Sequence, residues 1–102
     1  SYILPDFITK MNTEDQIKTG CKQLEEFLLE KNKRYGDSAL NPINTFSKGL
    51  DAGDKLNIRI DDKLSRIKNS HILRKNDIVD LAGYLVFVCI ENEWTDFKDQ
   101  ID

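Results

Sequence analysis

A fourteen-residue segment, residues 56–69, constrains the fold of this chain most, because it carries two side-chain stripes at helical spacing. Its apolar stripe recurs at i, i+4, i+8 and i+11 and consists of Leu56, Ile60, Leu64 and Ile67. Its cationic stripe recurs at i, i+4 and i+7 and consists of Arg59, Lys63 and Arg66. At about 100° per residue the stripes lie only about 90° apart, so the cations border the buried face. They therefore need an anion, either from other helices or from a ligand.

The charge of the chain is locally uneven. The 102 residues carry a net charge of −3, which argues against general affinity for duplex nucleic acid. Residues 55–75 hold seven Lys or Arg against two Asp, a net +5, and residues 76–102 hold seven Asp or Glu against one Lys, a net −6. A confined basic segment favours a phosphate site. The alternative is that the two segments pair with each other across a helix interface.

Length and composition favour one folded cytoplasmic domain. At 102 residues with 32% charged side chains, the chain is long enough for a single core. Cys21 and Cys89 lie in helical apolar patterns without a CxxC motif, which favours reduced, buried thiols. We see no signal-peptide pattern, and the longest apolar run, residues 81–90, is half a membrane span. We therefore expect a cytoplasmic protein with no membrane partner.

The periodicity predicts an all-α fold, a small helical bundle with three main helices and one short helix. We expect an irregular arm over residues 1–12, a bundle over 13–94 and an acidic tail over 95–102. The first helix begins at a capping box, Thr13 to Gln16, and runs to about Arg34. Its expected core stripe is Ile17, Cys21, Leu24 and Leu28. Asn41 and Pro42 predict the short helix, over residues 42–47.

Two further helices complete the prediction. Asp54 is expected to cap the central helix, and Asn76 to cap a last helix over residues 77–94. The last helix has the expected core stripe Ile78, Leu81, Leu85 and Val88, and it is apolar nearly all round. Such a helix needs cover on every side, so we predict at least a homodimer.

Acidic pairs at helical spacing are candidate metal ligands. Glu26 and Glu30 share a face of the first helix, and Asp77 and Asp80 share a face of the last. Of these, Glu30, Asp77 and Asp80 are our candidates for holding Mg²⁺. The alternatives are a solvated Glu30–Arg34 pair and a first-turn role for the aspartates in the helix dipole. His71, the only histidine, lies in a predicted turn and is expected to be structural or exposed.

Three segments together resemble a known family. They are residues 30–38 (EKNKRYGDS), 59–66 (RIDDKLSR) and 77–84 (DIVDLAGY). They look like a helical domain of phages and bacteria known as a nucleotide-modification-associated domain, which is similar to MazG-like all-α nucleotide pyrophosphohydrolases. The resemblance implies a usually dimeric helical bundle with a nucleotide site lined by acidic and basic side chains. The MazG-type acidic pattern, EExxE followed by ExxD, is incomplete in this chain.

The resemblance, together with the cationic stripe, indicates a set of nucleotide-binding candidates. Phosphate groups would contact the cationic stripe, Arg59, Lys63 and Arg66. Asn32 and Asp37 would hydrogen-bond the base or ribose. Tyr35, Tyr84 and Phe46 would stack against the base. Replacing Arg66 with alanine is expected to weaken binding by roughly 1–3 kcal/mol.

The expected function is that of a phage-type protein that sequesters a signalling nucleotide of host defence without turning it over. An intact cationic stripe beside an incomplete acidic set favours binding over hydrolysis, and no catalytic residue is assigned. One alternative is a Mg²⁺-dependent nucleotide pyrophosphohydrolase of the MazG-like type. Another is a structural or protein-interaction bundle in which the cationic stripe pairs with the acids of residues 76–102.

Overall fold

The described part of the chain is all-α. The computed structural model describes residues 11–35 and 51–101, which form three α-helices, one 3₁₀ turn and no strand. The elements are α2 (Thr13–Tyr35), α3 (Ala52–Asn69), α4 (Lys75–Glu91) and η1 (Lys98–Gln100). The predicted fold class, a small bundle of three main helices, is thereby confirmed. The predicted N-terminal arm and the short helix over residues 42–47 lie outside the described residues.

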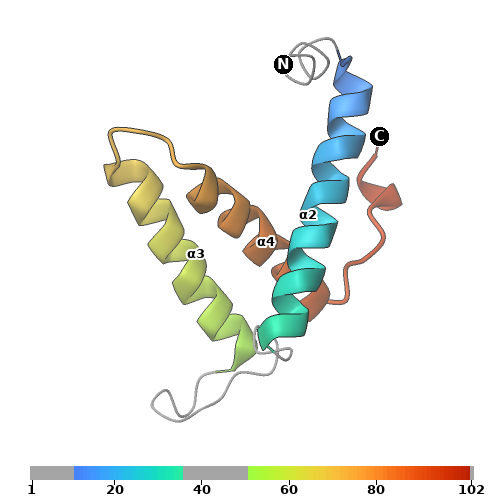
Figure 1. Ribbon diagram of the computed structural model, residues 1–102. Coiled ribbons are helices and arrows are strands. Elements are labelled where there is room, and N and C mark those ends of the chain that lie inside the picture. Colours follow the sequence, from blue (N-terminus) through green and yellow to red (C-terminus); the bar gives the residue numbers. More distant parts are fainter. Residues whose placement is uncertain (1–10, 36–50, 102) are drawn as a thin grey trace.

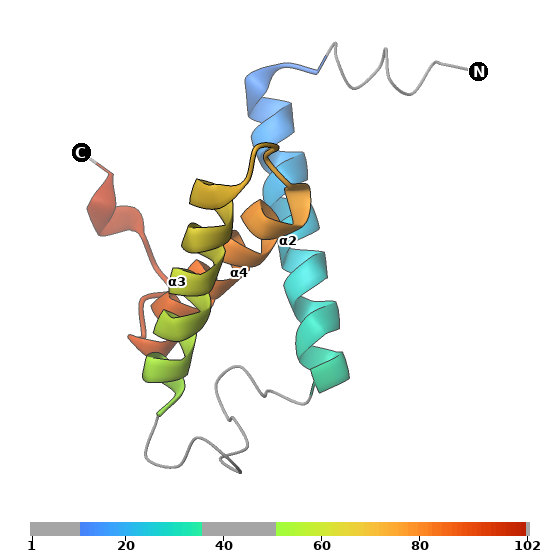
Figure 2. The ribbon, with the colours of Figure 1, turned by 90° about the vertical axis from the view of Figure 1, so that its left-hand side faces the viewer.

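The helices form a hairpin with a third helix laid across one end. α3 and α4 pack side by side and antiparallel, joined by the short connection through His71, as Figures 1 and 2 show. The C-terminal part of α2 crosses α4, whereas the N-terminal half of α2 stands away from the hairpin (Figure 1). The crossing is close, because a Cβ added at Gly83 would lie 2.7 Å from Cδ2 of Leu28. A glycine on α4 therefore allows α2 to approach.

α2 begins at Thr13, as predicted, but the capping residues of α2 and α3 differ from those predicted. Asn12 caps α2 in place of Thr13, since its Oδ1 accepts a hydrogen bond of 2.8 Å from the Asp15 N–H. Asp51 caps α3, accepting a 2.7 Å hydrogen bond from the Asp54 N–H, while the Asp54 side chain accepts one from the Asp51 N–H. Asp54 is therefore the third helical residue of a capping box, and the prediction that it is the cap is wrong.

The last long helix also differs from its prediction at both ends. α4 begins at Lys75, with Arg74 at the cap position and no capping hydrogen bond from a side chain, so Asn76 is not the cap. It ends at Glu91, three residues before the predicted Trp94. The chain turns there because Glu93 adopts a φ of 61° and the Trp94 N–H donates to the Cys89 carbonyl at 2.8 Å. A residue in the left-handed region is a common way to end a helix.

Replacing Asp51 with alanine is expected to lower the free energy of unfolding by about 1 kcal/mol, the usual effect of losing a capping side chain. Urea unfolding followed by circular dichroism measures the change. Asp51→Asn, which keeps a cap acceptor, is the matched control and should remain close to the parent protein. Equal stability of Asp51→Ala and the parent would show that the capping box contributes nothing.

The interior of the described part contains little apolar surface. Ala52 and Leu56 are its only buried apolar side chains, and Lys63 is buried on the same stripe of α3. Leu64, predicted to be buried, is 49% exposed, because α3 is turned so that Lys63 faces α4 in its place. Several other predicted core residues are exposed as well, and these are Ile17, Cys21, Ile78 and Leu85. The helices therefore present apolar faces that residues 11–35 and 51–101 do not cover.

No helix in the described part, residues 11–35 and 51–101, combines the length and apolar character needed to cross a bilayer.

Candidate functional site

A buried charge cluster joins α3 to α4. The Lys63 ammonium lies 3.0 Å from Oδ2 of Asp80 and 3.3 Å from Oδ1 of Asp77. The Lys63 side chain is 11% exposed and that of Asp77 is 4% exposed. Of the side chains that the structure describes, no buried polar atom lacks a hydrogen-bond partner. The cluster is thus fully paired, as buried charges in proteins generally are.

The carboxylates raise the pKa of Lys63 above its ordinary value of 10.5. The hydrogen bond to Asp80 is the main cause and the hydrogen bond to Asp77 adds to it, whereas burial acts in the opposite direction. A lysine whose pKa is raised on folding stabilises the folded state fully at pH values below the unfolded pKa. That stabilisation is lost as the pH rises through the higher folded pKa.

Stability is therefore expected to fall at pH values above 10.5, as Lys63 loses its proton. Urea unfolding measured from about pH 9 to about pH 12 tests this. Lys63→Arg is the matched control, because a guanidinium group stays charged over this range and the decline should be smaller. Identical pH profiles for the two proteins would show that Lys63 does not carry the effect.

The other two cations of the predicted phosphate site point elsewhere. Arg66 is exposed and pairs with Asp62 on its own helix, with 3.1 Å between Nε and Oδ2. Arg59 is exposed and makes no ion pair with any described residue. The structure therefore does not bring Arg59, Lys63 and Arg66 together in one pocket. Lys63 is neutralised by carboxylates of the same chain, as in the alternative in which the two charged segments pair.

The predicted metal ligands are not gathered into one site. Glu30 is exposed and accepts a 2.9 Å hydrogen bond from Arg34, while Asp77 and Asp80 are engaged by Lys63. Within residues 11–35 and 51–101, no group of three His, Cys, Asp or Glu side chains could hold a metal ion. The described carboxylates thus do not fit Mg²⁺ in this arrangement.

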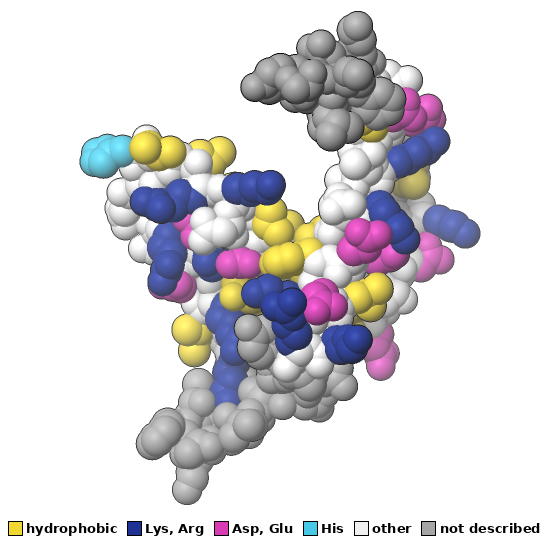
Figure 3. All heavy atoms as spheres, in the orientation of Figure 1, with side chains coloured by type: hydrophobic (Ala, Val, Ile, Leu, Met, Phe, Trp, Pro, Cys, Tyr) yellow, Lys and Arg dark blue, Asp and Glu magenta, His cyan; other side chains and the backbone are white. Residues whose placement is uncertain are grey.

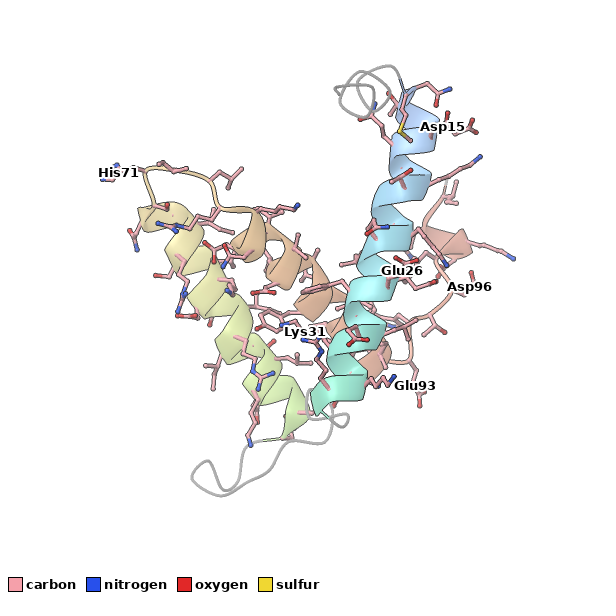
Figure 4. The ribbon with its side chains drawn as sticks, viewed as in Figure 1. Asp15, Glu26, Lys31, His71, Glu93 and Asp96 are labelled. Carbon is pink, nitrogen blue, oxygen red and sulfur yellow. The ribbon has the colours of Figure 1, made fainter. Side chains whose placement is uncertain are left out.

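The remaining nucleotide-binding candidates are dispersed. Asn32 is exposed on α2, and Tyr84 is half-buried on α4. Tyr35 is the last residue of α2, and its side chain is not described. Asp37 and Phe46 lie outside the described residues. His71 is exposed at the tip of the α3–α4 connection (Figure 4), in agreement with its prediction.

An open groove lies between the C-terminal half of α2 and the first turns of α4. Its volume is about 600 Å³, and its lining residues are Phe27, Lys31, Lys75, Asn76, Val79 and Asp80. The Lys31 ammonium lies 5.4 Å from the centre of the Phe27 ring, a cation–π contact. Figure 4 shows Lys31 on the side of α2 that faces the hairpin, and Figure 3 shows apolar side chains flanked by Lys and Arg between the helices. The groove adjoins the charge cluster, because Asp80 belongs to both.

The amino-terminal end of α4 is part of this groove. Lys75 and Asn76 are the first two residues of α4, and no side chain caps the N–H groups of its first turn. Free N–H groups and the helix dipole together attract anions at such an end. Arg74 and Lys75 add positive charge there, where a cation alone is unfavourable. The groove therefore combines an aromatic ring with several groups that favour an anion, beside the Asp80 carboxylate, which is paired with Lys63.

Five groove residues were not among the site candidates from sequence: Phe27, Lys31, Lys75, Asn76 and Val79. Phe27 and Lys31 are spaced i, i+4 and so share a helix face, which is a weak signal on its own. The stronger signal is the pair of cations at the start of a helix, where acidic residues are preferred. The sequence prediction placed that start two residues too late and so overlooked it.

Comparison of the chain with models of known families, with curated proteins and with solved structures finds no match.

Proposed function

We propose that this chain is a nucleotide-binding helical protein that holds a phosphorylated ligand in the groove between α2 and α4 and does not turn it over. The observation that carries the proposal is the groove itself, where an aromatic ring, lysines from two helices and an uncapped helix N-terminus line one space of about 600 Å³. That volume falls in the range of small-molecule sites.

The phosphate groups of the ligand would lie at the start of α4. The N–H groups of its first turn and the Lys75 ammonium can both donate hydrogen bonds to phosphate oxygens. Lys31 approaches from α2 on the opposite wall. This placement replaces the cationic stripe of α3 as the proposed phosphate site, because Lys63 and Arg66 are already paired with aspartates.

The base would contact Phe27. This ring is half-buried in the groove wall, and Val79 on α4 adds apolar surface. Stacking of a base on an aromatic ring is tolerant of base identity. Asn76 is the amide side chain in the groove lining that could select among bases, since an amide both donates and accepts hydrogen bonds.

Two features support binding without turnover. Hydrolysis of a phosphoanhydride by the MazG-like route uses Mg²⁺ held by several carboxylates. In this chain Asp77 and Asp80 are occupied by the Lys63 ammonium, and Glu30 pairs with Arg34. The proposal that the ligand is a signalling nucleotide, and the protein a phage product directed against host defence, rests on the sequence resemblance alone.

The proposal is tested by incubating the protein with a nucleotide panel, including cyclic di- and trinucleotides, in the presence of Mg²⁺. Denaturation and chromatography then report what was bound. We expect intact nucleotide to be recovered from the protein fraction. Release of pyrophosphate or a monophosphate would establish the pyrophosphohydrolase instead, and no retention of any nucleotide would refute both.

A second candidate is a structural bundle that assembles with further copies of itself. The internal pairing of Lys63 with Asp77 and Asp80 favours it, because a charge buried at a helix–helix seam specifies which faces meet. The large apolar residues exposed in the described part also favour it, and these are Ile17, Leu29, Ile58, Leu64, Ile72, Leu73, Ile78, Leu85, Ile90, Trp94, Phe97 and Ile101. This candidate predicts a homo-oligomer whose melting temperature no nucleotide changes.

A further inference from the structure

The residues that follow α4 form an arm that packs on nothing described. Trp94, Phe97 and Ile101 are 58%, 57% and 79% exposed, and η1 packs against none of the described helices. In Figure 2 the arm, residues 92–101, lies on the opposite side of the α3–α4 hairpin from α2. Three large apolar side chains within eight residues, all in water, indicate a segment that binds another surface.

The spacing within the arm is that of a helix with two faces. Trp94, Phe97 and Ile101 stand at i, i+3 and i+7, which places them within about 60° of one another on a helical wheel. On the same wheel Asp96 and Asp99 fall on the opposite side. The arm therefore has the pattern of an acidic peptide that becomes helical in an apolar groove.

The groove between α2 and α4 is complementary to that pattern. Phe27 and Val79 provide its apolar surface, and Lys31 and Lys75 provide positive charge from its two walls. The carboxylate of Asp80 is compensated by Lys63, so it does not repel an acidic segment strongly. Apolar anchors would meet the apolar surface, and the acids would meet the lysines.

The arm cannot reach the groove of its own chain as a helix. On α4 the groove extends from Lys75 to Asp80 and the arm begins after Glu91, so the two are separated by about 16–24 Å along the helix. Only residues 92 and 93 lie between Glu91 and a helix over 94–101, and the three steps from Glu91 to Trp94 span at most about 11 Å, so Trp94 would stop short of the groove. A second copy has no such restriction, and two copies can exchange arms reciprocally.

We propose that the arm of one chain docks in the α2–α4 groove of a second copy, with Trp94, Phe97 and Ile101 as anchors and Lys31 and Lys75 facing the acids. The docking itself does not depend on nucleotide binding. Because both ligands use one groove, the arm and a nucleotide would compete, and the part of the proposal that concerns this competition rests on the proposed function.

The test is the dimer dissociation constant of the full chain, measured by sedimentation equilibrium without nucleotide. We expect a dimer that Trp94→Ala/Phe97→Ala weakens at least tenfold and that the matched control Lys98→Ala leaves unchanged. Both anchors are exposed in the free chain, so at a concentration where both proteins are monomeric their far-ultraviolet circular dichroism and melting temperature should agree. A monomer at all concentrations, or a double variant that dimerises as the parent does, would overturn the proposal.

Reversing charges on the arm and on the groove tests whether the arm binds this groove in particular. Asp96→Lys/Asp99→Lys and Lys75→Glu should each weaken the dimer, and combining them should restore part of the loss. Absence of restoration would place the arm on another surface. Nucleotide binding by the same variants is measured in a separate titration. If no variant binds nucleotide, the proposed function fails while the dimer measurements still decide the docking.

Discussion

Replacing Lys63 with leucine is expected to lower the free energy of unfolding by about 3–5 kcal/mol, because it leaves the Asp77 carboxylate buried without a partner. Asp80 would lose its closest cation as well. Small domains have total stabilities of about 5–15 kcal/mol, so this is a large fraction. Urea unfolding followed by circular dichroism measures the change.

Two further variants show whether the effect comes from the cluster. Arg66→Ala breaks the exposed Arg66–Asp62 pair on the same helix and should change stability by only about 0.5 kcal/mol. Combining Lys63→Leu with Asp77→Leu and Asp80→Asn removes the buried charges together and should recover much of the loss. If Lys63→Leu unfolds at the same urea concentration as the parent protein, the cluster is not a stabilising contact.

Lys75→Glu is expected to weaken nucleotide binding by roughly 1.5–3 kcal/mol, a ten- to hundredfold change in dissociation constant. The substitution reverses the charge at the start of α4, where we place the phosphate groups. Isothermal titration with the nucleotide recovered from the panel measures the effect. Lys75 is exposed and makes no ion pair with a described residue, so the fold should be retained.

Arg66→Ala is the matched control for this measurement as well. The sequence alone predicts that it weakens binding by roughly 1–3 kcal/mol, whereas a ligand in the α2–α4 groove predicts almost no change. The two variants therefore distinguish the two placements of the phosphate. A large loss of nucleotide affinity in Arg66→Ala with no loss in Lys75→Glu would show that the phosphate groups bind the cationic stripe of α3 instead.

The helices were predictable because their signals are local. Apolar periodicity identified α2, α3 and α4, since a repeat near 3.6 residues is recorded in the order of side chains. Helix ends were less predictable, because several neighbouring residues can serve as a cap. Asp51 and Asp54 both have a cap-forming side chain, and only the backbone geometry shows that Asp51 is the cap and Asp54 its partner. Arg74 is not a capping residue type and its side chain makes no capping hydrogen bond, so the sequence held no capping signal there.

The candidate site was predictable only in its parts. Asp80 was selected from sequence as a candidate for holding Mg²⁺, and in the structure it pairs with Lys63 and lines the groove. Phe27 and Lys31 lie more than forty residues from Lys75 in sequence, and no local rule indicates that α2 approaches the start of α4. That approach depends on the crossing at Gly83 and Leu28, which is a contact between distant segments.

The order of residues in the chain determined that it forms amphipathic helices and that a row of cations borders the apolar stripe of α3. Only the tertiary structure decided which side of that helix turns inward. Two stripes about 90° apart can both border one interface. Rotating the helix about its axis by about 100°, the angle between successive residues, changes which stripe faces inward. In the folded chain Asp77 and Asp80 attract the Lys63 ammonium to the seam, and Leu64 turns out toward solvent. The reason is physical: a buried ammonium group needs carboxylates within hydrogen-bonding distance, and only the packing of α4 against α3 supplies them.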